Sequence, residues 1–194
     1  MKLRLLSEVR HEAEIKKSRF IALAAAAESE EQARNFIDRV SVPDATHNCW
    51  AWRIDERYRF DDDGEPGGTA GRPILQAIDG QNFDQTVVVV IRYFGGTKLG
   101  TGGLIRAYGG VTAEALRTAK STPIIPKVQL AVSLPFAYTD AAHHALGEFE
   151  GTKLDEVYSS SGVRLVVEIA KTRRNDFVDY LSNLARGEIT VKDS

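Results

Sequence analysis

The hydrophobic pattern is densest at residues 87–91, where five β-branched residues follow one another. Such a run is typical of a strand that is buried on both faces. The run leads through an aromatic pair into residues 95–103, which include five glycines. A helical pattern with one apolar face then begins near Leu104. The stretch 87–110 therefore predicts a strand, a glycine-rich loop and a helix N-terminus, which together can hold an anion or turn a tight corner.

The preceding segments alternate between strand and helix patterns. Residues 2–26 predict two strands, and Ser29 is a suitable N-cap for a helix that Pro43 ends. Residues 47–54 alternate as a strand, with both tryptophans of the chain on one face. A short helix is expected at 74–78, after another glycine-rich loop at residues 66–71.

Two prolines within residues 122–127 interrupt the periodicity and predict a domain boundary. We therefore expect domains at 1–124 and 127–194. The pattern of the second part has the order βαββαβ, which is the ferredoxin-like plan. The predicted fold class is α+β with two domains. The elements expected in the second part are a strand at 128–134, a helix at 140–149, a hairpin over 153–169, a helix capped by Thr172 and ending at Gly187, and a strand at 189–191.

Charge and composition restrict the function. A formal net charge of −2 over 194 residues argues against a generally basic nucleic-acid binder, although it leaves room for a local basic patch. The single cysteine, Cys49, excludes an internal disulfide and a thiolate-rich zinc site. The first residues lack the apolar core of a signal peptide, and no apolar run approaches the length of a membrane span. We therefore expect a cytoplasmic protein.

Known nucleotide and metal motifs do not fit. A Walker A loop would need lysine where Thr101 stands, and a dinucleotide fingerprint would need glycine at Ile105. The acidic run 61–65 does not match an EF-hand loop. Two interpretations of this run remain, a magnesium site and a solvated turn. His47 and Cys49 lie two residues apart on a strand, about 7 Å between Cα atoms, so a half-buried strand face is the simpler interpretation. No cofactor is predicted.

A local basic patch is the remaining candidate site. Its members fall at strand ends, in loops or in first helical turns, where ligands often collect. Such a patch can contact RNA phosphates, and Tyr93 can stack on a base. Alternatively, each arginine pairs with the acidic residues 61–65. The predicted nucleic-acid or phosphate-binding residues are Arg72, Arg92, Tyr93, Gly95, Gly96, Lys98, Gly100, Gly102, Gly103 and Arg106.

Two segments, 62–71 and 92–104, together resemble the signature of the IMPACT/YigZ family. Residues 17–21 and 47–51 are also similar to that family. The resemblance implies an N-terminal β-α-β domain of the ribosomal-protein type and a C-terminal ferredoxin-like domain similar to the last domain of elongation factor G. Asp61 stands where the family usually has serine, which argues against a hydroxyl nucleophile there. The family-motif residues of the first loop are Asp62, Asp63, Gly64, Glu65 and Gly71.

These observations predict a non-catalytic protein that associates with RNA or the ribosome and modulates translation. One alternative is an enzyme that acts on a phosphorylated small molecule or nucleotide through the glycine-rich loop, and another is a protein-interaction module. The expected partners are RNA, the ribosome or a translation-related protein. No membrane partner and no preference for DNA is expected.

Overall fold

The computed structural model describes residues 1–193. The chain divides into two compact units, Met1–Ile124 and Ile125–Ser194. Each unit has its own hydrophobic core. The architecture is mixed α and β, as the sequence pattern predicts. No helix within residues 1–193 is long and apolar enough to cross a membrane.

The first unit is built on a five-stranded antiparallel sheet with the order β2-β3-β6-β4-β5. The central strand is the predicted apolar run, and Val87 to Val90 are fully buried. Alternate residues of this run face two different cores, because side chains alternate across a strand. The strands are β2 (Val9–Ile15), β3 (Ser18–Ala26), β4 (His47–Ile54), β5 (Arg57–Asp61) and β6 (Thr86–Tyr93).

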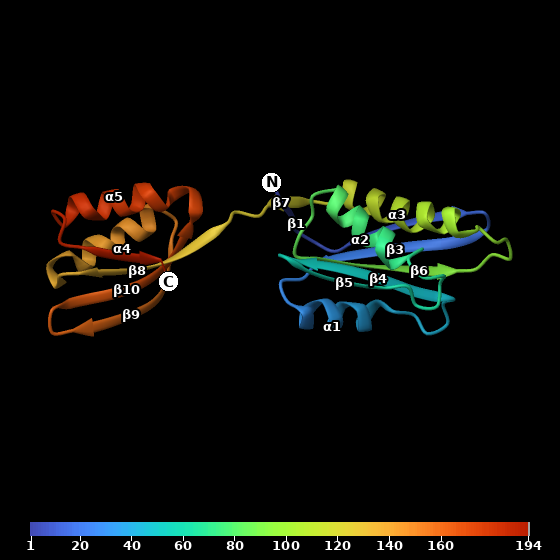
Figure 1. The fold of residues 1–194 in the computed structure, drawn as a ribbon, viewed down its shortest axis with the longest axis horizontal. Coiled ribbons are helices and arrows are strands. Elements are labelled where there is room, and N and C mark those ends of the chain that lie inside the picture. The colour runs from blue at the N-terminus through green and yellow to red at the C-terminus, as the bar shows by residue number, and fades with distance from the viewer. Residues whose placement is uncertain (194) are drawn as a thin grey trace. The chain divides into compact units, whose positions relative to one another are not determined.

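Helices cover both faces of this sheet (Figure 1). Helix α1 (Glu30–Val40) packs on one face, and Ser29 caps it by accepting a hydrogen bond from the Gln32 N–H, as predicted. Helices α2 (Gly71–Gly80) and α3 (Thr101–Arg117) cover the other face.

Three short strands depart from the prediction. Strand β1 (Leu3–Leu5) pairs with β7 (Ser121–Pro123), so residues 2–26 form three strands rather than two. The partner lies more than a hundred residues away, which local periodicity does not detect. Part of the predicted break at 122–127 is therefore strand. Strand β5 was missed because all five of its residues are exposed.

The second unit has the predicted order βαββαβ, with an antiparallel sheet ordered β11-β8-β10-β9. Thr172 does not cap the last helix, because Lys171–Arg173 form a 3₁₀ turn ahead of it. Gly187 ends that region with a φ of +83°, as expected for a C-terminal glycine. The elements are β8 (Lys127–Leu134), α4 (Thr139–Glu148), β9 (Thr152–Ser159), β10 (Gly162–Ala170), α5 (Arg174–Leu184) and β11 (Thr190–Asp193), with a further 3₁₀ turn at Phe136–Tyr138.

Candidate functional site

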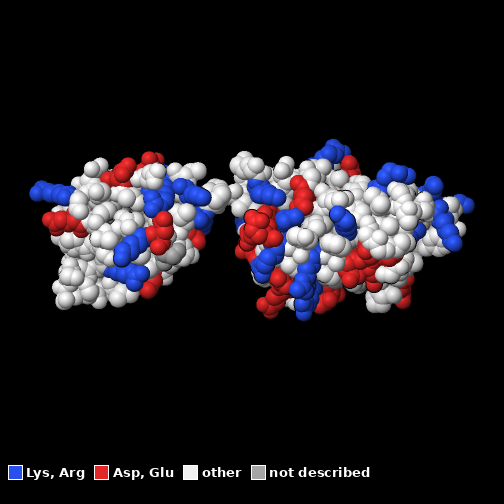
Figure 2. Space-filling view, in the orientation of Figure 1, with Lys and Arg blue, Asp and Glu red and all other residues white. Residues whose placement is uncertain are grey.

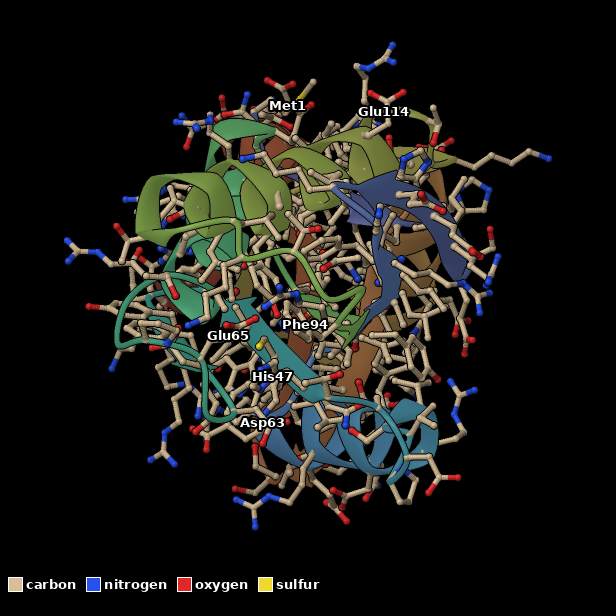
Figure 3. All side chains as sticks on the ribbon, turned by 90° about the vertical axis from the view of Figure 1, so that its right-hand side faces the viewer. Met1, His47, Asp63, Glu65, Phe94 and Glu114 are labelled. Carbon is tan, nitrogen blue, oxygen red and sulfur yellow. The ribbon has the colours of Figure 1, made fainter. Side chains whose placement is uncertain are left out.

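A cavity of about 410 Å³ lies in the first unit between its two glycine-rich loops, and we call it the loop cavity. The first loop is residues 62–71 and the second loop is residues 95–103. Its walls come from the start of β4, the end of β6, the first loop and the first turn of α3. Figure 3 shows His47, Glu65 and Phe94 near one another at this end of the unit. The lining residues are Thr46, His47, Glu65, Pro66, Arg92, Phe94, Lys98, Leu99, Gly100, Thr101 and Leu104.

The first loop is held in shape by the carboxylate of Asp62. One oxygen accepts hydrogen bonds from the N–H groups of Ala70 and Gly71, at 3.0 and 2.8 Å, and the other accepts one from Gly68 at 2.7 Å. The N–H groups of Ala70 and Gly71 lie at the start of α2, where N–H groups lack partners within the helix. A Cβ atom at Gly71 would lie 2.6 Å from the carbonyl oxygen of Asp61, so the loop also needs glycine there.

This arrangement bears on the magnesium interpretation of the acidic run. Both carboxylate oxygens of Asp62 bind backbone N–H groups, and a carboxylate oxygen of Asp63 accepts one from Asn48. Within residues 1–193, no group of three or more His, Cys, Asp or Glu side chains is placed to hold a metal ion. Asp62 and Asp63 therefore hold backbone N–H groups of the loop and of β4.

A buried ion pair joins the first loop to the end of β6. Arg92 Nη1 donates to Glu65 Oε1 at 2.6 Å, and the two side chains are only 6% and 4% exposed. The Tyr108 hydroxyl donates to the same oxygen at 2.7 Å. Arg92 also lies against the rings of Phe20 and Phe94, 5.4 and 5.5 Å from their centres.

Arg92, which the sequence places in a local basic patch, is buried. Its side chain faces α3 beneath the first loop, and it pairs with the acidic segment, as the alternative interpretation expects. Its Nε is buried without a hydrogen-bond partner among the described residues. Arg92 therefore contributes an incompletely satisfied cation to the wall of the loop cavity.

His47 and Cys49 do not form a nucleophile–base pair. His47 Nδ1 lies 2.7 Å from the carbonyl oxygen of Asp63, so Nδ1 carries the donated proton, and Nε2 lies 3.8 Å from Glu65 Oε1. The Cys49 thiol is buried between the Asp62 carbonyl and the Tyr108 hydroxyl, at 3.1 and 3.4 Å. Burial raises the pKa of Cys49 to about 12, so the thiol stays protonated at neutral pH.

The second loop supplies an exposed positive charge to the cavity. Lys98 is exposed, lines the cavity and makes no ion pair with any of residues 1–193. Helix α3 begins after Gly100, whose φ is +73° and which offers no side-chain cap to the first-turn N–H groups. Unsatisfied N–H groups and the helix dipole both favour a bound anion. Lys98 and this helix start therefore make one corner of the cavity suited to an anion.

The remaining predicted binding residues do not line the loop cavity. Gly95 is architectural, because a Cβ atom there would lie 1.7 Å from the Lys17 carbonyl oxygen. Tyr93 is half-buried, with the Arg19 guanidinium 5.8 Å from its ring centre. Arg72 and Arg106 are exposed on α2 and α3 and lie outside the cavity lining. Gly96 has a φ of +87° in the turn, while Gly102 and Gly103 belong to the first turn of α3.

Basic side chains are visible at the loop-cavity end of the first unit in Figure 2, the right-hand end in that view.

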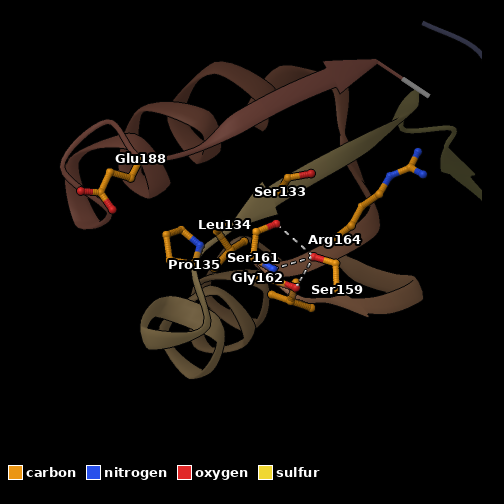
Figure 4. Close-up of a pocket in the computed structure, with 9 residues that line it drawn as sticks. Ser133, Leu134, Pro135, Ser159, Ser161, Gly162, Arg164 and Glu188 are labelled. Carbon is orange, nitrogen blue, oxygen red and sulfur yellow. Dashed lines mark hydrogen bonds between the residues drawn. The ribbon is translucent and has the colours of Figure 1, made fainter.

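A second cavity, of about 260 Å³, lies in the second unit at the β9–β10 turn (Figure 4). There the Ser159 hydroxyl donates to the Gly162 carbonyl at 3.0 Å. Its lining holds one cation, Arg164, and one carboxylate, Glu188. The loop cavity is therefore the better candidate for an anion.

Sequence reasoning missed Tyr108 and His47 as neighbours of Glu65. Tyr108 was expected only as part of an apolar helix face, yet its fully buried hydroxyl needs a partner and finds Glu65. A hydroxyl on the buried face of a helix was the available signal.

Comparison with known proteins places this site within a described family. The family described as Impact N-terminal domain matches residues 16–116, which contain every residue that lines the loop cavity. The chain is 45% identical over 179 residues to an IMPACT family member of Thermus thermophilus, covering 92% of this chain and 99% of that protein. It is 35% identical to the IMPACT family member YigZ of Escherichia coli, with 92% and 90% covered. A solved structure titled as a hypothetical protein, 34% identical, superposes with a TM-score of 0.78 over 98% of this chain and 95% of that one.

Proposed function

Because the chain belongs to the IMPACT family, we propose that it is a non-catalytic protein that binds RNA, associates with the ribosome and modulates translation. The resemblance of the second unit to the last domain of elongation factor G supports a ribosomal partner. The β11-β8-β10-β9 sheet of that unit agrees with a ferredoxin-like domain.

The observation that carries this proposal is the anion-binding corner of the loop cavity. Lys98 and the start of α3, which has no side-chain cap, line the same space. Phosphates of RNA are bound by such groups. Arg72 and Arg106, which make no ion pair among the described residues, add positive charge on the first turn of α2 and the second turn of α3. Phosphate contacts of this kind give affinity that falls steeply with salt.

The test is binding of labelled single-stranded RNA over a salt series, together with co-sedimentation with ribosomes. Lys98→Ala should weaken binding and lower the slope of log affinity against log salt by about 1, because one phosphate contact is lost. Arg117→Ala is the matched control, since Arg117 is exposed at the other end of α3 and pairs with Glu114. Absence of binding at low salt would overturn the proposal.

A second candidate is an enzyme that acts on a phosphorylated small molecule or nucleotide. The volume of about 410 Å³ falls in the range of small-ligand pockets. His47 Nε2 and Glu65 also line that space, so the cavity holds groups that can exchange protons. Thermal unfolding with nucleotides, with and without magnesium, separates the two candidates. Stabilisation by a nucleotide without RNA binding would favour the enzyme, and no response to either would favour a protein-interaction module.

A further inference from the structure

A second cleft in the first unit lies on the opposite face of the sheet from the loop cavity. It has a volume of about 350 Å³ and is formed between α1 and the strands β4 and β5. We call it the Trp50 cleft. Its lining includes Trp50, Trp52, Arg34, Arg59 and Asp38.

Strand register explains how aromatic and basic groups come together here. Trp52 pairs directly with Arg59 across the β4–β5 ladder, so both side chains point to the α1 face. Trp52 is 4% exposed and belongs to the core, whereas Trp50 is only partly buried. The indole of Trp50 is therefore the aromatic surface that the cleft leaves accessible.

The charges around this indole are free to meet a ligand. Arg34 and Arg59 are exposed and form no ion pair with any side chain in the described part of the chain. The neighbouring carboxylate of Glu30 is used by Arg57, whose Nη1 lies 3.3 Å from Glu30 Oε1. The Asp38 carboxylate makes no hydrogen bond or ion pair within residues 1–193. The cleft thus combines a π-face, two guanidinium groups and two carboxylates, of which only that of Asp38 has no ion-pair partner among the described residues.

We propose that the Trp50 cleft binds an unstacked nucleobase of single-stranded RNA, an inference that rests on the proposed RNA binding. A base stacks on an indole or on a guanidinium plane with little regard to its identity. Asp38 accepts a hydrogen bond from an amino or imino group on the base edge, and the two arginines neutralise the flanking phosphates. An acidic peptide would use the arginines but would leave the indole without a stacked partner.

The position of the cleft also suits an RNA strand that reaches the loop cavity. His47 lines that cavity and Trp50 lines the cleft, three residues further along β4, or about 10 Å. Only the five-residue strand β5 lies between β4 and the edge of the sheet. A single strand of RNA that contacts both places passes around this edge, alongside the acidic residues that follow β5.

The chain carries its own reporter, because Trp50 and Trp52 are the two tryptophans in the sequence. Unlabelled single-stranded RNA should quench tryptophan fluorescence with the same midpoint as the anisotropy change of a labelled RNA. Inorganic polyphosphate should displace the labelled RNA without this quenching, since it has no base to stack.

Variants separate stacking from general electrostatics. Trp50→Ala and Arg59→Ala should each weaken RNA binding about 10-fold, while Trp50→Phe should stay within about 3-fold of the parent because a ring remains. Arg117→Ala, which changes an exposed arginine on α3, should have little effect. Circular dichroism of each variant checks that the fold is retained.

Two results together would overturn the proposed base binding by the Trp50 cleft and leave the proposed function standing. They are an anisotropy change without tryptophan quenching, and an RNA affinity of Arg59→Ala equal to that of Arg117→Ala. Absence of any anisotropy change would overturn both.

Discussion

The buried Glu65–Arg92 pair should control the stability of the first unit. Glu65→Gln keeps the shape of the side chain and an acceptor oxygen for Tyr108, but it removes the negative charge beside a guanidinium that is 6% exposed. At 2.6 Å, two unit charges interact with about 6 kcal/mol at an effective dielectric constant of about 20. Part of this energy offsets the desolvation of the two ions. We therefore expect a net loss of about 3–5 kcal/mol, as when one partner of a buried pair is removed.

Urea unfolding followed by tryptophan fluorescence measures this loss selectively, because both tryptophans lie in the first unit. Glu28→Gln is the control, since its partner Arg4 and Glu28 itself are 41% and 57% exposed and an exposed pair contributes at most about 1 kcal/mol. Combining Glu65→Gln with Arg92→Met should restore much of the lost stability, because no unpaired charge then remains buried and Tyr108 keeps an acceptor oxygen. A loss below about 1 kcal/mol for Glu65→Gln, equal to that for Glu28→Gln, would refute the reasoning.

Three further predictions concern the loops and the buried thiol. Gly95→Ala should lower the free energy of unfolding by about 2–3 kcal/mol, because its Cβ would lie 1.7 Å from the Lys17 carbonyl oxygen. The control is Gly110→Ala, at an open helical site, which should raise the free energy of unfolding by about 0.5–1 kcal/mol in the same urea titration. Asp62→Ala should cost about 3 kcal/mol by thermal or urea unfolding, since three backbone N–H groups lose a charged acceptor, and equal stability of the variant would contradict the role of that carboxylate. Burial raises the pKa of Cys49 from 9.0 to about 12. As pH rises, the unfolded chain therefore loses the thiol proton at a lower pH than the folded chain does. Between pH 9 and 12 this difference lowers the free energy of unfolding by up to about 1.4 kcal/mol per pH unit. Cys49→Ala should show a shallower alkaline loss, and rapid reaction of the folded protein with a thiol reagent at pH 8 would contradict the burial argument.

Local pattern was a reliable guide wherever one face of an element is buried. The central strand, the helix that Ser29 caps and the βαββαβ order of the second part were predicted from periodicity and capping, and the structure contains all of them. Strand β5 and the β1–β7 pair escaped prediction. The first is exposed throughout, and the second is defined by a partner distant in the chain.

The sequence by itself determined the α+β class, the central strand with its glycine-rich loop, and the resemblance to the IMPACT family, because these depend on residues that are near one another in the chain. Only the tertiary structure decided which charges are free. It buried Arg92 against Glu65, left Lys98 at the start of α3, and set Arg59 beside the indoles of β4. Charge pairing depends on distances between segments far apart in sequence, and those distances follow from sheet register and packing rather than from composition.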